Sequence, residues 1–142
     1  MTFANDGRTF YSCSDDGLVK SWKVYPGGNE DWATPHGPIS TYRSTQNGSL
    51  KNIDYHRSQP QFATAGDTSV DIWDPERNAP IQSFTDHWGT TGDTSTVVRY
   101  NPAERNLLGQ CSMDRGIGLF DTRSGSALQK TVLQMRSNCL EW

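Results

Sequence analysis

The sequence has few of the features that mark membrane, secreted or disulfide-bonded proteins. No apolar run approaches the roughly 20 residues that span a bilayer, and residues 1–7 have neither the basic nor the apolar segment of a secretory signal. The three cysteines, Cys13, Cys111 and Cys139, have no Cys-x-x-Cys spacing, so they are interpreted as reduced side chains. The histidines form no His-x₃-His pair, and zinc sites need clustered ligands. These absences favour an intracellular protein with no membrane segment, no metal site and no bound cofactor.

Hydrophobic residues and positive charge are also scarce. Only 33% of the 142 residues are hydrophobic, and the chain contains 13 glycines and 7 prolines. The mean hydropathy is −0.74 and the isoelectric point lies near 5.5. A net charge of −3 supplies no general attraction to nucleic-acid phosphates. Since no segment keeps a helical period, this composition predicts an all-β chain of short strands and many turns.

One hairpin pattern occurs three times along the chain. In each copy an aspartate stands six positions before an aromatic residue, in the pairs Asp16–Trp22, Asp67–Trp73 and Asp114–Phe120. A β-branched residue follows each aspartate by three positions, and a small residue (Cys13, Thr64 or Cys111) precedes it by three. Trp73 lies 51 residues after Trp22, and Phe120 lies 47 residues after Trp73, a period typical of a repeated four-stranded unit.

The alternation of apolar residues and the turn signals between them predict the strands. We expect strands at residues 9–13, 18–22, 39–42, 50–55, 61–65, 70–73, 81–84, 96–100, 107–111, 116–120 and 127–133. They group into a partial first unit at 3–42 with a long loop, a second at 49–84 and a third at 95–133. Residues 137–142 have the pattern of a further innermost strand. The Asn47-Gly48 pair matches a glycosylation pattern with Ser49 but is better explained as a hairpin turn.

Residues 67–74, Asp-Thr-Ser-Val-Asp-Ile-Trp-Asp, resemble the WD40 repeat. The copies at 16–23 and 114–121 are weaker, because Ser21 and Phe120 replace an apolar residue and a tryptophan. The resemblance implies four-stranded blades of a β-propeller, about two and a half blades of a presumed seven. It also implies that the turn aspartate, a strand Ser/Thr, the tryptophan and a histidine, here His87, hydrogen-bond together. Because at least three stacked repeats are needed to bury a continuous core, the sequence is expected to be part of a longer propeller.

A closer resemblance covers most of the chain outside the 24–48 loop. Residues 11–16, 62–77, 87–89 and 120–123 with 135–138 are similar to the Sof-type WD40 proteins of the U3 small nucleolar ribonucleoprotein. This resemblance implies a non-catalytic scaffold in the small-subunit processome, located in the nucleus and nucleolus. Its implied partners are other processome proteins, with U3 RNA and precursor ribosomal RNA contacted mainly indirectly.

The residues give little support for catalysis. Asp16, Asp67 and Asp114 occupy the same place in each repeat, which favours turn-stabilising hydrogen bonds over acid catalysis. No Gly-x-Ser-x-Gly elbow is present, and Gly116 and Gly118 lie in a strand with no helix behind them to form a phosphate loop. A hydrolase on a propeller scaffold would need a clustered acid and base that the sequence does not show. We therefore predict no catalytic residues.

Asp121 and Arg123 are the candidate partner-contact residues. Phe-Asp-Thr-Arg at 120–123 resembles the Trp-Asp-x-Arg motif by which some WD40 proteins bind the adaptor of a cullin-RING ubiquitin ligase. Arginine suits such contacts because its planar group makes several hydrogen bonds at once. The alternative is a turn arginine that pairs with Asp121 or stays in water. Two weaker candidates are Trp32 as a partner anchor and a basic excess near the C-terminus that faces RNA; for both, the structural alternatives are favoured.

Overall fold

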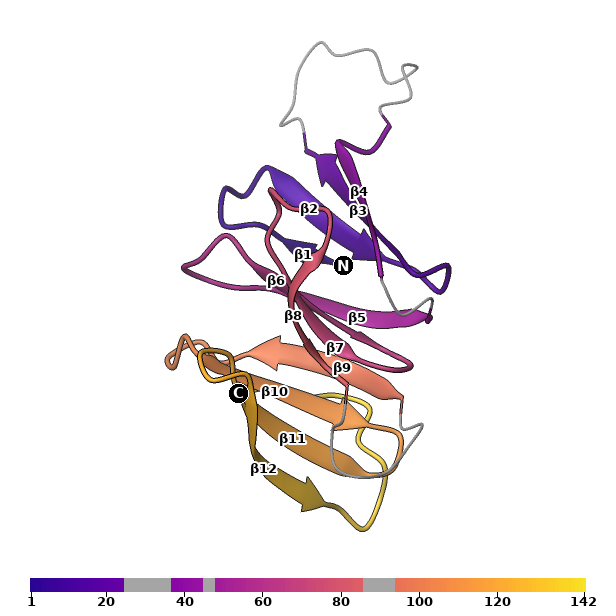
Figure 1. Ribbon diagram of the computed structural model, residues 1–142, viewed down its shortest axis with the longest axis vertical. Helices are drawn as coiled ribbons and strands as arrows, with labels where there is room; N and C mark the ends of the chain where they lie inside the picture. Colours follow the sequence, from indigo (N-terminus) through magenta and orange to yellow (C-terminus); the bar gives the residue numbers. More distant parts are fainter. Residues whose placement is uncertain (25–36, 45–47, 86–93) are drawn as a thin grey trace.

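The computed structural model describes residues 1–24, 37–44, 48–85 and 94–142, and these residues form three four-stranded antiparallel sheets (Figure 1). Sheet 1 contains β1 (Thr2–Phe3), β2 (Thr9–Cys13), β3 (Leu18–Lys23) and β4 (Ser40–Arg43). Sheet 2 contains β5 (Leu50–Tyr55), β6 (Phe62–Gly66), β7 (Val70–Trp73) and β8 (Pro80–Phe84). Sheet 3 contains β9 (Ser95–Tyr100), β10 (Leu107–Ser112), β11 (Gly116–Asp121) and β12 (Ser126–Val132). The described residues contain no helix that is long and apolar enough to cross a membrane.

The all-β prediction is confirmed, and each of the eleven predicted strands is present within one residue at either end. Three strands, β2, β5 and β7, have the predicted limits, and the others shift by a residue at one or both ends. Each strand pairs with the next along the chain, so every sheet is an up-and-down meander. The predictions for Trp32, for Asn47, for His87 and for most of the 24–48 loop lie outside the described residues.

The two ends of the chain differ from the expectation. Sheet 1 has four strands, because the two residues of β1 pair with Tyr11 and Phe10 of β2. Residues 137–142 form no strand, although their side chains lie against sheet 3: Leu140 and Trp142 crowd the α-carbon of Gly109. This segment therefore takes the position of an innermost strand without a neighbouring strand in the described residues to hydrogen-bond with it.

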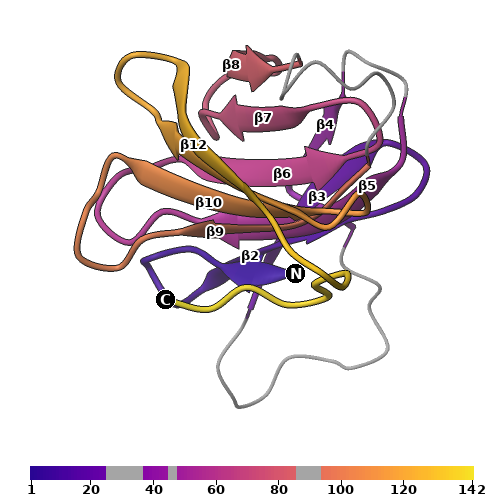
Figure 2. The same ribbon diagram turned by 90° about the horizontal axis from the view of Figure 1, so that it is seen from below.

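The sheets stack face to face, with sheet 2 between the other two; Figure 2 views the stack from the side of sheet 3. Sheet 1 contributes Tyr11 and Tyr42 to the first interface, where they contact Phe62 and Trp73 of sheet 2. Ring centroids are 4.9 Å apart for Tyr11 and Phe62 and 6.3 Å apart for Tyr42 and Trp73. The second interface buries a mixed aliphatic and aromatic cluster: Ala63, Ala65, Val70, Ile72, Phe84, Val98, Tyr100, Leu108 and Phe120. Burial of these faces is the main source of stability of the stack.

Polar side chains of one sheet also bind the innermost strand of the next. Asp54 Oδ2 accepts the N–H of Tyr100 at 2.8 Å, and Asn52 Oδ1 accepts the N–H of Val98 at 3.4 Å. The hydroxyl of Thr2 accepts the N–H of Tyr55 in the same way at 3.3 Å. These bonds satisfy backbone donors at the edge of each innermost strand, where no further strand can reach them. These bonds therefore set the register of each sheet against its neighbour.

His56 joins sheets 2 and 3. Its Nε2 lies 2.7 Å from the carbonyl oxygen of Arg105, while Nδ1 accepts the N–H groups of Ser58 and Gln59. Because a carbonyl can only accept, these contacts select the neutral tautomer that carries its proton on Nε2. The ring also packs edge-on against Tyr100, with centroids 4.7 Å apart.

Candidate protein-contact site

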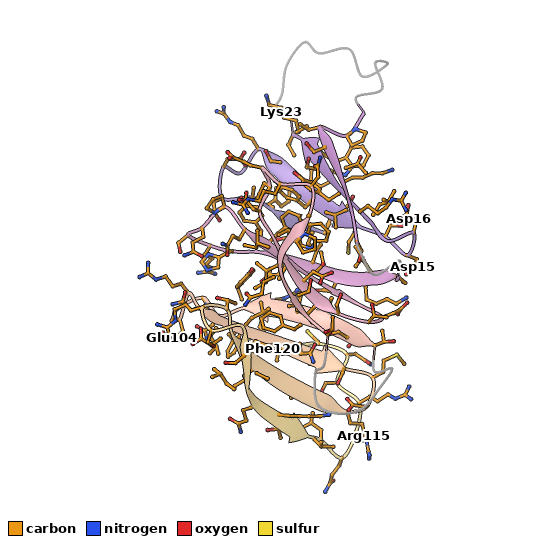
Figure 3. All side chains as sticks on the ribbon, in the orientation of Figure 1. Asp15, Asp16, Lys23, Glu104, Arg115 and Phe120 are labelled. Atoms are coloured by element: carbon orange, nitrogen blue, oxygen red, sulfur yellow. The ribbon has the colours of Figure 1, made fainter. Side chains whose placement is uncertain are left out.

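The aromatic residues of the repeat are placed in equivalent positions. The indole N–H of Trp73 donates to the hydroxyl of Thr64 at 2.9 Å, and that of Trp22 donates to Ser12 at 2.9 Å. Trp73 is fully buried, whereas Trp22 is half-buried on the outer face of sheet 1. Phe120 has no such donor and instead packs against Phe84 of sheet 2, with centroids 4.7 Å apart. In Figure 3, Phe120 lies at the boundary between sheets 2 and 3.

The three turn aspartates do not all make the same hydrogen bonds. Asp16 Oδ1 accepts the N–H of Leu18 at 3.0 Å, and Asp114 Oδ1 accepts the N–H of Gly116 at 2.8 Å. These are Asx turns of the expected kind. Asp67 instead accepts the N–H of Ser49 at 3.1 Å, so its carboxylate holds the entry of β5.

Asp67 bonds differently from Asp16 because the two hairpins differ in length. Five residues separate the paired Cys13 and Val19, but only four separate Ala65 and Val70. The sequence alignment of Thr64 with Cys13 and Cys111 is therefore wrong by one position. By strand register Thr64 corresponds to Ser12, which is why both hydroxyls meet a tryptophan indole.

Asp114 is the most strongly held of the three aspartates. Its carboxylate accepts bonds from the hydroxyl of Ser112, from the N–H of Gly116 and, at 3.0 Å, from Lys130 Nζ on β12. Partial burial opposes ionisation, but these bonds, that from Ser112 foremost, hold the pKa of Asp114 well below its usual range. The charge of Asp114 thus ties the turn to the outermost strand of sheet 3.

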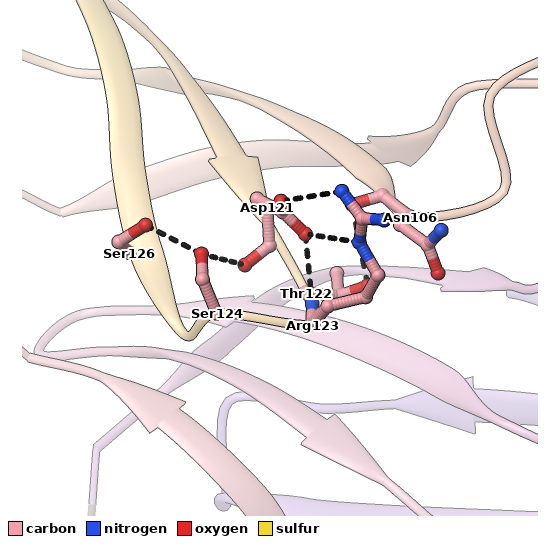
Figure 4. A network of polar contacts seen from close by, with 6 residues as sticks. All are labelled: Asn106, Asp121, Thr122, Arg123, Ser124 and Ser126. Carbon is pink, nitrogen blue, oxygen red and sulfur yellow. Dashed lines mark hydrogen bonds and ion pairs between the residues drawn. The ribbon is translucent and has the colours of Figure 1, made fainter.

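The Asp121–Arg123 turn joins β11 to β12, at the other end of β11 from the Asp114 turn (Figure 4). Asp121 Oδ1 accepts the backbone N–H of Arg123 at 2.9 Å, and Oδ2 accepts Arg123 Nη2 at 3.1 Å. The Nε of Arg123 also donates to Oδ1 at 3.3 Å, so Nε and Nη2 together bind both carboxylate oxygens of Asp121. The structure therefore brings the two predicted contact residues together in the paired arrangement.

The charge pair has an electrostatic signature at both partners. The hydrogen bond from the Arg123 side chain lowers the pKa of Asp121, and the bond to Asp121 raises the pKa of Arg123. Glu104, on the neighbouring turn, adds a smaller contribution to Arg123. The Arg123 side chain is still 71% exposed, so its outer edge is accessible to a carbonyl or carboxylate of another protein.

The turn is supported from behind by backbone and side-chain contacts. The N–H of Thr122 donates to the carbonyl oxygen of Asn106 at 2.9 Å, which ties the turn to the start of β10. Gln82 of sheet 2 also reaches it: with its amide nitrogen turned toward the turn, Gln82 donates to the carbonyl oxygen of Thr122 at 3.0 Å. Gly125, at φ +66°, lets the chain reverse beside Gln82. Arg123 therefore projects from a turn that both sheets hold in place.

A similar arginine occurs in sheet 2. Arg77 Nε lies 3.6 Å from Asp74 Oδ2 in the turn between β7 and β8, and its side chain is also 71% exposed. It stands four positions after Trp73, whereas Arg123 stands three positions after Phe120. Arg77 thus shares the charge pair and the exposure of Arg123 but not the motif spacing.

The part of the chain that the structure describes holds no group of three histidine, cysteine or acidic side chains that could bind a metal ion. Cys13, Cys111 and Cys139 are free thiols. The bridging residues Asn52, Asp54 and His56 were missed by sequence reasoning, because each bonds to a backbone group at least 46 residues away. Polar residues inside or just after a predicted innermost strand were the only signal that could have pointed to them.

Comparison with known proteins identifies the repeat. The WD40 family, described as "WD domain, G-beta repeat", matches residues 1–23. A chain in the solved structure "Crystal Structure of Mitotic Checkpoint Complex" superposes with a TM-score of 0.72, covering 92% of this chain and 38% of that chain at 19% identity. The match places a WD40 repeat at residues 1–23, and the superposition extends over all three sheets. The predicted fold class, all-β with incomplete propeller blades, is confirmed.

Several proteins that share one name are more similar in sequence. The protein called "DDB1- and CUL4-associated factor 13" from Danio rerio is 39% identical over 136 residues, covering 96% of this chain. The proteins of that name from Dictyostelium discoideum and Homo sapiens are 37% and 40% identical and cover 100% and 96% of the chain. The chain spans only 28–30% of the length of these three relatives.

Proposed function

We propose that this chain acts as part of a non-catalytic WD40 scaffold in small ribosomal subunit biogenesis, within the U3 ribonucleoprotein and the small-subunit processome. The observation that carries the proposal is the stack of blades itself. Polar bridges through Asn52, Asp54 and His56 fix each blade on the next, so the turns keep a constant spacing on both edges. A rigid array of turns suits the binding of several proteins at once. The resemblance to Sof-type sequences is the reason for proposing the small-subunit processome in particular.

The proposed location is the nucleolus, with RNA contacted mainly through other proteins. The net charge of −3 supports indirect contact, because it offers no general attraction to phosphates. The test is affinity purification of the tagged protein from cells, with U3 RNA measured against an abundant unrelated RNA. We expect U3 enrichment that survives a high-salt wash. Enrichment no greater than that of the unrelated RNA would refute the processome assignment.

A second function, substrate receptor of a cullin-RING ligase, is supported by the exposed guanidinium of Arg123. The names of the relatives state association with DDB1 and CUL4, and the Phe-Asp-Thr-Arg turn holds Arg123 beside Asp121 while its side chain stays 71% exposed. One propeller can carry both interfaces, so the two functions are compatible.

Arg123→Ala tests this second function, and Arg77→Ala is the matched control. Both changes remove an equally exposed arginine from a charge pair on a β-hairpin turn. We expect Arg123→Ala to abolish co-purification of the adaptor and Arg77→Ala to leave it intact. Equal losses in both variants would assign the effect to general charge, and no loss in either would exclude Arg123 as the contact.

A further inference from the structure

The peptide unit that carries Arg123 is bound from two sheets. Asp121 Oδ1 accepts the N–H of Arg123 at 2.9 Å, and the carbonyl oxygen of Thr122 accepts the side-chain amide of Gln82 at 3.0 Å. Asp121 belongs to sheet 3, whereas Gln82 lies on β8 in sheet 2. Because a peptide unit is planar, fixing its carbonyl and its N–H also fixes the position of the α-carbon of Arg123. Gln82 therefore acts on the placement of Arg123 from the neighbouring sheet.

The surroundings of Gln82 fit this contact. Its side chain is half-buried, and its amide oxygen shares the N–H of Gly125 with the carbonyl oxygen of Asp121, at 3.2 Å and 3.0 Å. Gly125 has φ +66°, and a β-carbon there would lie 2.5 Å from the end of the Gln82 side chain. Only glycine lets Gln82 come this close in this conformation. One amide group thus uses both its donor and its acceptor on the turn.

The turn that carries Arg77 is held by its neighbouring sheet in a different way. Tyr42 Oη on β4 of sheet 1 donates to the carbonyl oxygen of Pro75 at 2.8 Å. That carbonyl belongs to the peptide unit before Glu76, so the bond does not reach the unit that carries Arg77. Tyr42 and Gln82 thus both join an outermost strand to a turn of the next sheet, but only Gln82 binds the peptide unit of the arginine.

We propose that Gln82 is a positioning residue for the contact between Arg123 and the ligase adaptor, so that this contact depends on the docking of sheet 2 on sheet 3. The inference rests on the second proposed function, in which Arg123 binds that adaptor. Gln82 raises the fraction of molecules whose turn already has the binding arrangement, and the apparent affinity for a partner is proportional to this fraction. The adaptor site is therefore built from two blades, although its arginine comes from one.

Gln82→Met tests the proposal in the full-length protein. Methionine is similar in length to glutamine but cannot donate to the carbonyl oxygen of Thr122. Tyr42→Phe is the matched control, because it keeps the ring and removes the bond to Pro75. Hydrogen exchange of residues 121–126 measures how often the turn opens, and thermal melting establishes that each variant keeps its fold. Association and dissociation rates are measured with the purified ligase adaptor.

We expect Gln82→Met to speed exchange at residues 121–126 and to lower the association rate constant by about two- to tenfold, the range for the net loss of one hydrogen bond. The dissociation rate constant should stay unchanged, because the bound adaptor still selects the same arrangement of the turn. Tyr42→Phe should change neither the exchange of residues 121–126 nor the two rate constants.

Unchanged exchange in Gln82→Met, or faster exchange with an unchanged association rate, would overturn the positioning role. A faster dissociation rate alone would also overturn it, because Gln82 would then contact the adaptor directly. Equal effects in Tyr42→Phe would assign the loss to general loosening of the stack. The second proposed function fails in a distinguishable way: Arg123→Ala would bind the adaptor as tightly as the wild type, and the exchange data would still show whether Gln82 holds the turn.

Discussion

We predict that Arg115 destabilises the fold and that replacing it with glycine raises the free energy of unfolding. It closes the hairpin between β10 and β11 with φ at +73°, a left-handed conformation that side chains disfavour. The equivalent position in sheet 1 is Gly17, with φ at +75°. Both hairpins have the same length, so the chain needs a left-handed residue at this place in each. Figure 3 shows Arg115 on the same side of the stack as Asp16, as this equivalence requires.

The magnitude follows from two opposing contributions. A non-glycine residue pays about 1–2 kcal/mol in the left-handed region. Glycine in turn costs about 0.4–1 kcal/mol through the greater freedom of the unfolded chain. The backbone N–H and carbonyl oxygen of Arg115 bond to Ser112 and Leu133, and glycine keeps both bonds. We therefore expect Arg115→Gly to raise the free energy of unfolding by about 0.5–1 kcal/mol.

Gly17→Ala is the converse change, and by the same two contributions its backbone effect should lower stability by about 0.5–1 kcal/mol. A β-carbon at Gly17 would also lie 3.0 Å from the carbonyl oxygen of Gly48, which adds to the loss. Urea denaturation followed by tryptophan fluorescence measures both variants, with an unchanged m-value as the check that compactness is unaltered. A loss of stability in Arg115→Gly, or a neutral Gly17→Ala, would refute the shared left-handed turn.

Three further changes test buried polar groups. Thr64→Val keeps the side-chain shape but removes the acceptor of the Trp73 indole, so we expect urea denaturation to show a free energy of unfolding lower by about 1–3 kcal/mol. Ser12→Ala should lower it less, because its partner Trp22 is only half-buried. Equal losses in the two variants would contradict this explanation. Asp114→Asn should flatten the acid side of the stability profile: the folded pKa is lowered, so the carboxylate stabilises the fold above the ordinary value of 3.8 and this contribution is lost as the pH falls. Asp71 is fully buried, and the side chains of Ser69 and Ser83 lie beside its carboxylate, although neither of its oxygens has a partner at full hydrogen-bond geometry in the described part of the chain. Burial raises its pKa, so ionisation costs stability as the pH rises above 3.8, and Asp71→Asn should raise the melting temperature at pH 7 but not at pH 3; an equal effect at both would exclude the charge as the cause.

The sequence by itself determined the strands and the repeat. Apolar alternation and turn residues fix where a strand can form, and these are local properties, so the limits of β2, β5 and β7 were predicted correctly. The pairing of Asp121 with Arg123 was also one of the alternatives open from sequence, because the two residues stand two positions apart in one turn.

The tertiary structure alone decided how repeats align and how blades join. Thr64 matches Ser12 and not Cys13, since the hairpin of sheet 2 is one residue shorter, and only the strand register shows this. Asn52 and Asp54 bind backbone donors of β9 that come within reach only after two blades stack. Whether an aromatic pair is core or surface was likewise decided by stacking: the Phe62–Trp73 and Phe10–Trp22 pairs are alike in sequence, but a neighbouring sheet buries only the first.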